Sequence, residues 1–500
     1  MACREGEWGR GARCCCAWFH ASSPRLIPHP VPSRSSSCRD WNRADCREHE
    51  RLIGGKAIRA SSLGRRVFSL RVKPWRRRTD DGREWPVSVF CGIDWAEDHH
   101  DIALVDAGGQ LVAKRRITDD AAGFGELLTL LAEAGDGASA PIPVAIETSR
   151  GLLVAALRET GRPVYAINPM AVARYRERHS VARKKSDHID ALTLANILRT
   201  DAHAHRRLPG DSDLARAIAV LARAAQDAIW RRTRATQELR ALLREYYPGF
   251  LDAFGDSVHT NLATLEARAI LAVAPTPEQG ARLTKSRIVA VLRRAGRQRR
   301  LDDAATRIQD ALRRRQLRQP PLVEQAMGRQ ARALVATLDA ECANAQELNE
   351  AASESFRQHP DHAVITSFPG LADVTGARVL AEIGDDRGRF ADARGLKAFA
   401  GSAPVTRASG RSIAVTHRHV KNNRLAAVGF VWAFVAAGRE GPARAHYLAR
   451  REHGDRHAAA LRHLFNRMLG QLYQCLQTDQ KYDAIKAFPC HGTTPEPAAA

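Results

Sequence analysis

The hydrophobic pattern of the chain changes abruptly at Val87, where apolar runs of strand length begin. Three such runs, separated by turns, predict an antiparallel meander. Beyond them, apolar spacing of helical period alternates with two further strand-like runs. The predicted strands cover 87–94, 100–109, 111–118, 141–148 and 163–168, and the predicted helices cover 121–134, 151–161, a segment from Pro169, and 187–199.

Three antiparallel strands followed by alternating helix and strand is the element order of an RNase H-like (RuvC-like) mixed α/β domain, here over residues 87–199. Its chemistry needs carboxylates at strand ends. Asp94 ends the first strand and Glu147 ends the fourth, while Asp187 and Asp190 share one face of the last helix. Clustered carboxylates repel one another unless a cation lies between them, and hard oxygen ligands suit Mg²⁺ or Mn²⁺. Each carboxylate alone is explained as well by a turn or a helix cap, but the ordered set favours a two-metal site that cleaves phosphodiesters.

The middle of the chain, residues 200–357, is dominated by a helical repeat. Apolar positions at alternating steps of four and three predict coiled-coil helices over 214–246 and 327–348. The two helices can pair within the chain or across a dimer, and the pattern does not distinguish these. Between them, residues 282–318 hold 13 Lys and Arg against 3 Asp. This basic segment fits either a solvated helix face or contacts with a nucleic-acid backbone.

The last predicted unit, residues 358–475, is mainly helical and begins with a turn at Pro369-Gly370. This turn resembles a helix-hairpin-helix, whose exposed backbone N–H groups can hold a phosphate. Gly, Ser and Arg are frequent over 401–420, which predicts a loop or a short hairpin before a hydrophobic helix. We expect residues 476–500 to form a disordered tail.

Composition adds information about the partner and the compartment. The chain has 500 residues, too many for one ordinary core, and its net charge of +22 points to a polyanion, with nucleic acid as the first choice. An apolar content of 44% excludes a wholly disordered chain. No run has the length of a transmembrane helix or the apolar core of a secretory signal. We therefore expect a cytoplasmic protein with no membrane partner.

Residues 1–86 differ from the rest of the chain. They hold 6 of the 10 Cys and 5 of the 8 Trp, carry a net charge of +10 and show no persistent period. The cysteines lack the paired spacing of zinc sites. We expect a disordered basic extension, and one hypothesis is that translation naturally starts near Val87 or Val89. Mass spectrometry of the native N-terminus tests this, since abundant peptides from residues 1–80 would contradict it.

Four segments carry a family resemblance: GIDWAEDHHDIALVD, VAIETSRG, INP and RKKSDHIDALTLANIL. They resemble the DEDD domain of the IS110/IS1111 family of transposases, in which a basic run, here Arg183-Lys184-Lys185, precedes the last acidic pair. The block over residues 388–436, with the motifs Gly401-Ser402-Ala403-Pro404 and Ser409-Gly410, resembles the C-terminal IS110/IS116/IS902 transposase domain. The resemblance implies that four catalytic carboxylates bind two Mg²⁺ (or Mn²⁺) ions, namely Asp94, Glu147, Asp187 and Asp190. It also implies that Ser409 is the nucleophile.

The resemblance further implies an insertion-sequence transposase that acts as a recombinase. Ser409 would attack a DNA phosphodiester and form a covalent link, with basic side chains at Arg407, Arg411, Arg418 and Lys421 near the phosphate. A structured noncoding RNA would pair with donor and target DNA, and the protein would act as a dimer or tetramer. Ser402 and Ser412 compete with Ser409, and Asn422-Asn423 stands where the family commonly has a glycine.

Two other functions remain open at this point. A metal-dependent nuclease of the Holliday-junction type needs the four carboxylates but no serine. A non-enzymatic DNA or RNA binder needs only the basic surface, and its acidic and serine positions would be structural.

Overall fold

The computed structural model of the chain describes residues 76–78, 84–86, 89–179, 187–255, 261–410 and 412–488. Two compact units divide the chain between Leu208 and Pro209, beyond the predicted boundary at residue 199. The first unit extends past residue 199 because the chain returns to the sheet after helix α4 (Asp187–Asp201) and the short helix η2 (Ala202–Ala204). There the N–H of Leu208 donates to the carbonyl oxygen of Val164 at 2.7 Å.

The first unit is built on a five-stranded sheet with the strand order β5-β4-β3-β6-β7. The first three strands form the predicted antiparallel meander, and β6 and β7 run parallel to β3. The strands are β3 (Val89–Trp95), β4 (His99–Asp106), β5 (Leu111–Thr118), β6 (Val144–Ile146) and β7 (Val164–Ala166). This arrangement confirms the predicted RNase H-like fold.

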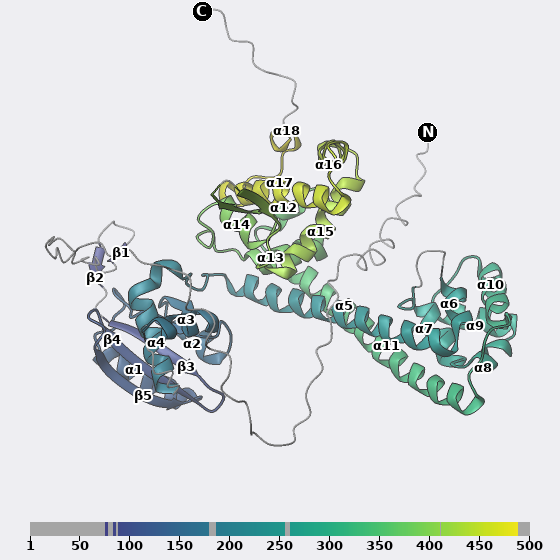
Figure 1. Ribbon diagram of the computed structural model, residues 1–500, viewed down its shortest axis with the longest axis horizontal. Coiled ribbons are helices and arrows are strands. Elements are labelled where there is room, and N and C mark those ends of the chain that lie inside the picture. The colour runs from purple at the N-terminus through teal and green to yellow at the C-terminus, as the bar shows by residue number, and fades with distance from the viewer. Residues whose placement is uncertain are drawn as a thin grey trace, which may run out of the picture. The chain divides into compact units, whose positions relative to one another are not determined.

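Helices cover both faces of this sheet (Figure 1). Because side chains alternate along a strand, one face of β3 presents Ile93 to a core that includes Leu127 of α1 (Ala121–Glu133) and Leu153 of α2 (Leu152–Glu159). The opposite face presents Phe90 to a core shared with α3 (Pro169–His179) and α4. The central strands β3 and β6 are therefore buried on both sides, which fixes the positions of their ends.

Two short strands, β1 (Arg76–Arg78) and β2 (Glu84–Pro86), pair antiparallel inside the segment for which disorder is predicted. The rest of that segment, including its cysteines, lies outside the described residues. The same holds for the basic run Arg183-Lys184-Lys185.

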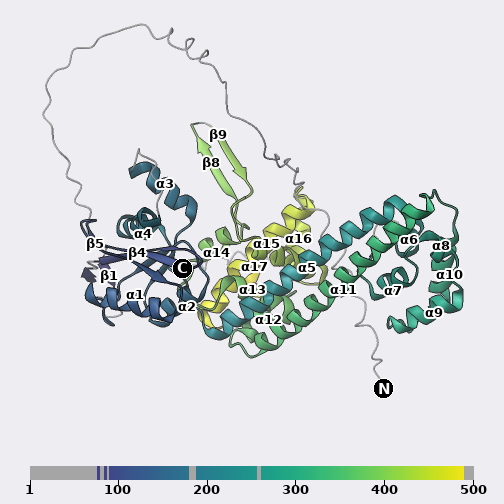
Figure 2. The same ribbon diagram turned by 90° about the horizontal axis from the view of Figure 1, so that it is seen from below.

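The second unit contains two long helices, α5 (Asp213–Tyr246) and α11 (Pro321–Arg357), which lie side by side within the chain (Figures 1 and 2). Buried positions such as Leu239 and Leu338 belong to the predicted apolar repeats. The pairing left open by the sequence is therefore made inside one chain. Between these helices the chain forms α6 (Pro248–Phe254), α7 (Leu265–Val273), α8 (Pro277–Ala281), α9 (Lys285–Arg294) and α10 (Leu301–Arg313).

The rest of the second unit is a helical cluster with one small hairpin, packed around the fully buried Trp432. Its elements are α12 (His362–Thr366), α13 (Asp373–Ile383), α14 (Ala393–Phe399), β8 (Val405–Ser409), β9 (Ser412–Thr416), α15 (Asn423–Gly438), α16 (Pro442–Glu452), α17 (His457–Thr478) and α18 (Ala484–Ala487). Helix α18 lies inside the predicted disordered tail, where Phe488 is buried against this cluster. Residues 489–500 lie outside the described range.

The turn at Pro369-Gly370 is packed against α15 and is not exposed, contrary to the sequence-based expectation. Gly370 has a φ of +89°, and a Cβ atom there would lie 2.8 Å from the carbonyl oxygen of Trp432. The indole N–H of Trp432 donates to the carbonyl oxygen of Pro369 at 3.0 Å. The turn thus serves packing, since its backbone faces the protein. In the part of the chain that is described, no helix is long and apolar enough to cross a membrane.

Candidate active site

Asp94 and Glu147 are neighbours because their strands run parallel. β3 and β6 pair with Ile93 opposite Ile146. Asp94 is the next residue of β3, and Glu147 directly follows β6. Paired strands lie about 4.8 Å apart, so the two half-buried residues stand next to each other at the carboxyl ends of adjacent strands.

Helix α4 lies across the face of the sheet to which Asp94 belongs. A Cβ atom on Gly92, two residues before Asp94, would lie 2.0 Å from the carbonyl oxygen of Ala191. Glycine therefore allows α4 to lie directly on β3. At the other end of α4, Arg199 Nη1 donates to the carbonyl oxygen of Ala107 at 3.4 Å. Ala107 follows Asp106, which pairs with Val89, the first residue of β3. The first turn of α4 consequently lies toward the end of β3 that carries Asp94.

Asp190 lies in that first part of α4 and faces the sheet. Its side chain is buried, and Leu194, one turn later, belongs to the core beneath the helix. Arg176 of α3 places Nη2 at 2.7 Å from Asp190 Oδ1. In this structure the buried carboxylate is therefore compensated by an arginine.

Three of the four predicted carboxylates, on β3, after β6 and on α4, thus belong to one face and one end of the sheet. Asp187 is the first residue of α4, but its side chain lies outside the described residues. Among the side chains that are described, no three His, Cys, Asp or Glu groups are arranged to hold a metal ion. The donors present are carboxylate oxygens, the ligand type that Mg²⁺ and Mn²⁺ prefer.

Sequence reasoning missed another carboxylate on this face, that of Asp101. It lies directly opposite Asp94 in the antiparallel pairing of β3 and β4, so both side chains point to the same face. Arg116 of β5 binds both oxygens of the buried Asp101, at 3.1 Å through Nε and 2.7 Å through Nη2. The strand register identifies Asp101 as a neighbour of Asp94, and the bidentate ion pair with Arg116 engages both of its oxygens within the protein.

Ser409 belongs to the second unit, where it ends strand β8. In the antiparallel pairing of β8 and β9, Ser409 is opposite Ser412, so the connection is only two residues long and begins with Gly410. The φ of +55° at Gly410 is the left-handed conformation that such tight hairpin turns need. The predicted loop or short hairpin is therefore a hairpin, and Figure 2 shows it extending away from the helical cluster.

The two faces of this hairpin differ in chemistry. Arg407, Ser409 and Ser412 lie on one face, because opposed and alternate residues share a side of a strand pair. The other face carries Ile413 and Val415, which are 71% and 65% exposed. A two-stranded hairpin with both faces open is only marginally stable alone, so its position depends on how its two ends are anchored.

Both ends of the hairpin are held by polar contacts. At the first, the competing Ser402 is buried and its Oγ donates to Asn466 Oδ1 at 3.0 Å. At the second, Asn422 accepts a hydrogen bond from the N–H of Leu425 at 2.8 Å and donates one to Glu382 Oε2 at 2.7 Å. The asparagine found where the family commonly has a glycine therefore caps α15 and ties the hairpin to α13. Ser412 remains exposed beside Ser409.

The predicted basic segment, residues 282–318, covers α9, α10 and their connections. Some of its arginines are engaged within the protein: Arg297 lies 3.2 Å from Glu266, and Arg314 lies 3.5 Å from Asp252. Other exposed arginines have no ion-pair partner among the described residues, and they include Arg293, Arg299 and Arg315. This surface therefore retains uncompensated positive charge.

Comparison with known proteins gives two family matches. The DEDD transposase family of IS110 matches residues 91–248, and the IS116/IS110/IS902 transposase family matches residues 362–448. The chain is also 59% identical over 402 residues to the protein assigned as the mini-circle transposase for IS117 of Streptomyces coelicolor. The aligned region covers 80% of this chain and 97% of that relative. The chain belongs to the IS110 family of transposases.

Other relatives are more distant. The transposase is 27% identical over 413 residues to the 43.6 kDa protein of insertion element IS110 from Streptomyces coelicolor, across 80% of the transposase and 96% of the relative. The solved structure of RuvC from Thermus thermophilus matches with 21% identity and a TM-score of 0.19, across 24% of the transposase and 99% of RuvC. As a transposase, the protein is an enzyme that cuts and rejoins DNA, which excludes the non-enzymatic alternative.

Proposed function

We propose that the transposase cuts DNA with the carboxylates of Asp94, Glu147, Asp187 and Asp190, and that Ser409 forms a covalent link to the cut strand. The observation that most strongly supports the carboxylate site is the in-register pairing of β3 with β6, which makes Asp94 and Glu147 neighbours. The position of α4 supports it further, because the helix brings a buried Asp190 to the same face.

The four carboxylates would hold two Mg²⁺ ions, or Mn²⁺ in their place. Bound there, the ions would activate the attacking oxygen and stabilise the leaving oxygen of a phosphodiester. The all-oxygen donor set fits such ions. Arg176 now neutralises Asp190 at 2.7 Å, and an ion bound to the same oxygen would compete with this arginine.

The proposed serine step is a substitution at phosphorus. The Oγ of Ser409 attacks the scissile phosphate, an O–P bond forms, the P–O bond to the leaving sugar oxygen breaks, and the serine proton is lost while the leaving oxygen gains one. Arg407 supports this role, because it lies on the same hairpin face as Ser409. Arg418 and Lys421 follow on the return toward α15, and Arg411, outside the described residues, adds another positive charge in the sequence. These charges would stabilise the additional negative charge of the transition state.

A structured noncoding RNA is the further partner that we propose, with the basic segment 282–318 as its contact surface. The exposed, uncompensated arginines of this segment support that assignment, since backbone contacts of this kind depend on charge and not on sequence. Because two DNA duplexes must be cut and joined, we also propose that several copies assemble, as a dimer or a tetramer, in the bacterial cytoplasm at the nucleoid.

Covalent trapping of end-labelled donor DNA tests the proposal. Wild-type protein with Mg²⁺ and the cognate RNA should give a denaturation-resistant adduct, while Ser409→Ala and Asp187→Ala should give none. Ser412→Ala is the matched control, because it removes the hydroxyl opposite Ser409 in the hairpin and should leave the adduct intact.

The same experiment separates the proposal from a nuclease that uses only metal ions. If Ser409→Ala cleaves DNA at the wild-type rate, the serine is not the nucleophile and the metal-dependent nuclease is the better description. If adduct forms equally well with Asp187→Ala in the presence of a chelator, the carboxylate site has no role in the cut.

A further inference from the structure

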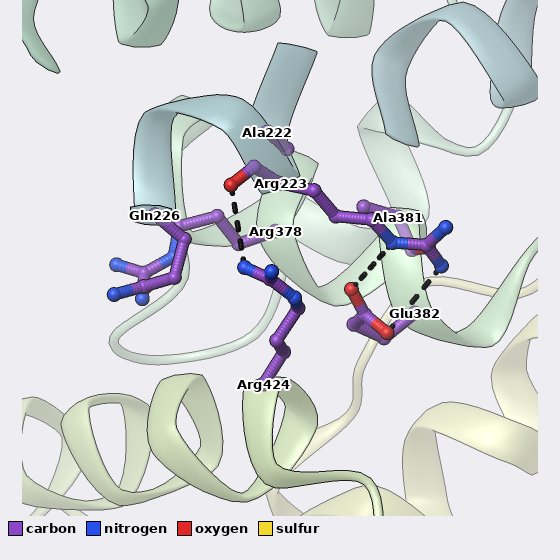
Figure 3. Close-up of a pocket in the computed structure, with 7 residues that line it drawn as sticks. All are labelled: Ala222, Arg223, Gln226, Arg378, Ala381, Glu382 and Arg424. Atoms are coloured by element: carbon purple, nitrogen blue, oxygen red, sulfur yellow. Dashed lines mark hydrogen bonds and ion pairs between the residues drawn. The ribbon is translucent and has the colours of Figure 1, made fainter. Parts of the chain in front are cut away.

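A small pocket lies where α5, α13 and α15 meet in the second unit (Figure 3). Its cavity of about 10 Å³ is close to the minimum that accommodates one water molecule or one oxygen atom of an anion. Figure 3 shows the guanidinium of Arg424 rising from α15 between Gln226 and Arg378 on one side and the pair of Arg223 and Glu382 on the other. Three arginines therefore line a space too small for a side chain.

Two of these arginines are compensated by carboxylates. Arg223 donates to Glu382 Oε1 at 2.9 Å and to the carbonyl oxygen of Ala381 at 2.8 Å. Arg424 donates to both oxygens of Asp227, at 2.7 Å and 2.9 Å. With these partners the charges of Arg223 and Arg424 are balanced within the protein.

Arg378 and Gln226 are not satisfied in this way. Arg378 is partly buried and makes no hydrogen bond or ion pair with any other described residue. Burial and the nearby charge of Arg424 lower the pKa of Arg378 to about 10, although the carboxylate of Glu382 partly opposes them, so the guanidinium remains charged at neutral pH. Gln226 is 2% exposed, and neither its amide nitrogen nor its amide oxygen has a hydrogen-bond partner. A partly buried cation with no hydrogen-bonded counter-ion and a buried amide with no partner are both unfavourable unless a ligand completes them.

We propose that this pocket binds one phosphate group of a nucleic-acid backbone, through Arg378, Arg424 and the amide of Gln226. A single phosphate oxygen fits the cavity, and the rest of the group would remain at its mouth. The anion would balance the charge of Arg378 and accept a hydrogen bond from Gln226 Nε2. A bound water would satisfy the amide but would leave the charge uncompensated, which is why we favour the anion. The inference rests on the proposed function only in taking nucleic acid as the source of the phosphate.

The pocket is connected to the serine hairpin by a short chain of hydrogen bonds. Arg223 holds Glu382, and Glu382 accepts a hydrogen bond at 2.7 Å from Asn422 at the end of the hairpin. A phosphate bound in the pocket would therefore lie against the residues that anchor the strand pair of Ser409. Backbone binding here would position nucleic acid relative to the hairpin without reading its sequence.

Thermal unfolding of the full-length protein with inorganic phosphate tests the pocket directly. At constant ionic strength, replacing chloride by phosphate should raise the Tm of the wild type by several degrees and leave that of Arg378→Met nearly unchanged. Arg378→Lys keeps the charge and should retain part of the shift. Arg394→Met, which removes an exposed arginine from α14, is the matched control and should respond to phosphate like the wild type.

Binding of a mixed-sequence DNA duplex and of an RNA hairpin then identifies the source of the phosphate. Arg378→Met should weaken binding to one of them by about tenfold and reduce the slope of log K against log salt by about one. If Gln226→Met raises the Tm and neither phosphate nor nucleic acid distinguishes Arg378→Met from wild type, the pocket contains only a structural water and the proposal is wrong. Failure of the covalent trapping experiment would not change these readouts, because they measure binding and not cleavage.

Discussion

The sheet that carries Asp94 and the hairpin that carries Ser409 differ in how firmly each side chain is held. Asp94 stands on a strand that is paired on both sides and covered on both faces. Ser409 stands at the tip of two strands that pair only with each other, and its side chain is exposed. The first position is fixed by many neighbours, while the second is fixed only by the ends of the hairpin.

This difference fits the role that we propose for each group. Carboxylates that bind metal ions repel one another before the ions arrive, so a rigid sheet is needed to hold them together. A nucleophile that must approach DNA gains from a support that can move. We therefore expect substitutions in the sheet to affect both folding and activity, and substitutions in the hairpin to affect activity far more than stability.

The largest effect is expected for the ligand carboxylates. Asp94→Asn should lower the rate of DNA cleavage by at least about 10³-fold, because it removes a proposed metal ligand. Asp101→Asn is the comparison variant, since Asp101 lies opposite Asp94 but is paired with Arg116, and it should cost about tenfold or less. Cleavage rates measured across a Mg²⁺ titration check this, and equal losses for the two variants would contradict the distinction between ligand and neighbour.

A pair of glycine substitutions compares the two supports. Gly92→Ala places a methyl group 2.0 Å from the carbonyl oxygen of Ala191 and should destabilise the sheet unit by about 3 kcal/mol, with loss of cleavage. At Gly410, with its φ of +55°, alanine strains only the turn, by about 1 kcal/mol. Thermal unfolding followed by circular dichroism should show a clear fall in Tm for the first variant alone.

The anchor of the hairpin on α13 should have an intermediate effect. Asn422→Ala removes both the cap of α15 and the hydrogen bond to Glu382, and we expect it to cost about 1–2 kcal/mol. Asn423→Ala, one residue later at an exposed position, should cost much less. Amide hydrogen exchange at Leu425 reports the loss of the cap, and unchanged exchange in Asn422→Ala would show that the anchor is dispensable.

The smallest effect concerns a carboxylate that lies outside the proposed metal site and is paired with neighbouring side chains. Hydrogen bonds from His362 and Arg357 hold the pKa of Asp373 below its usual value, although burial partly opposes them. Because the pKa is lowered in the folded state, the carboxylate adds stability above its unfolded pKa and loses it as the pH falls through the folded value. Asp373→Asn should therefore cost less than about 1 kcal/mol near pH 6, and urea unfolding below about pH 4 should show the difference disappearing.

Much of the fold could be predicted from local patterns. Apolar runs of strand length identified every strand of the five-stranded sheet, and the positions of Asp94 and Glu147 at strand ends placed them next to each other. Helical spacing identified α5 and α11, and the frequency of Gly and Ser indicated a turn near Ser409. These predictions succeed because periodicity reports which face of a single element is buried.

Other features depended on partners that are distant in the sequence. The exposure expected for the Pro369-Gly370 turn was wrong because Trp432, more than sixty residues away, covers it. Helix α18 was missed for a similar reason, since it is only four residues long and the adjacent Phe488 is buried against the helical cluster.

The amino-acid sequence by itself determined the strands, the helices and the acidic residues at strand ends, because each follows from the chemistry of neighbouring positions. Only the tertiary structure decided that α5 pairs with α11 in the same chain, that Asp101 lies beside Asp94, and that Arg378 and Gln226 line one pocket. Strand register and helix docking are set by the packing of remote surfaces against each other, and no local pattern in the chain encodes which surfaces will meet.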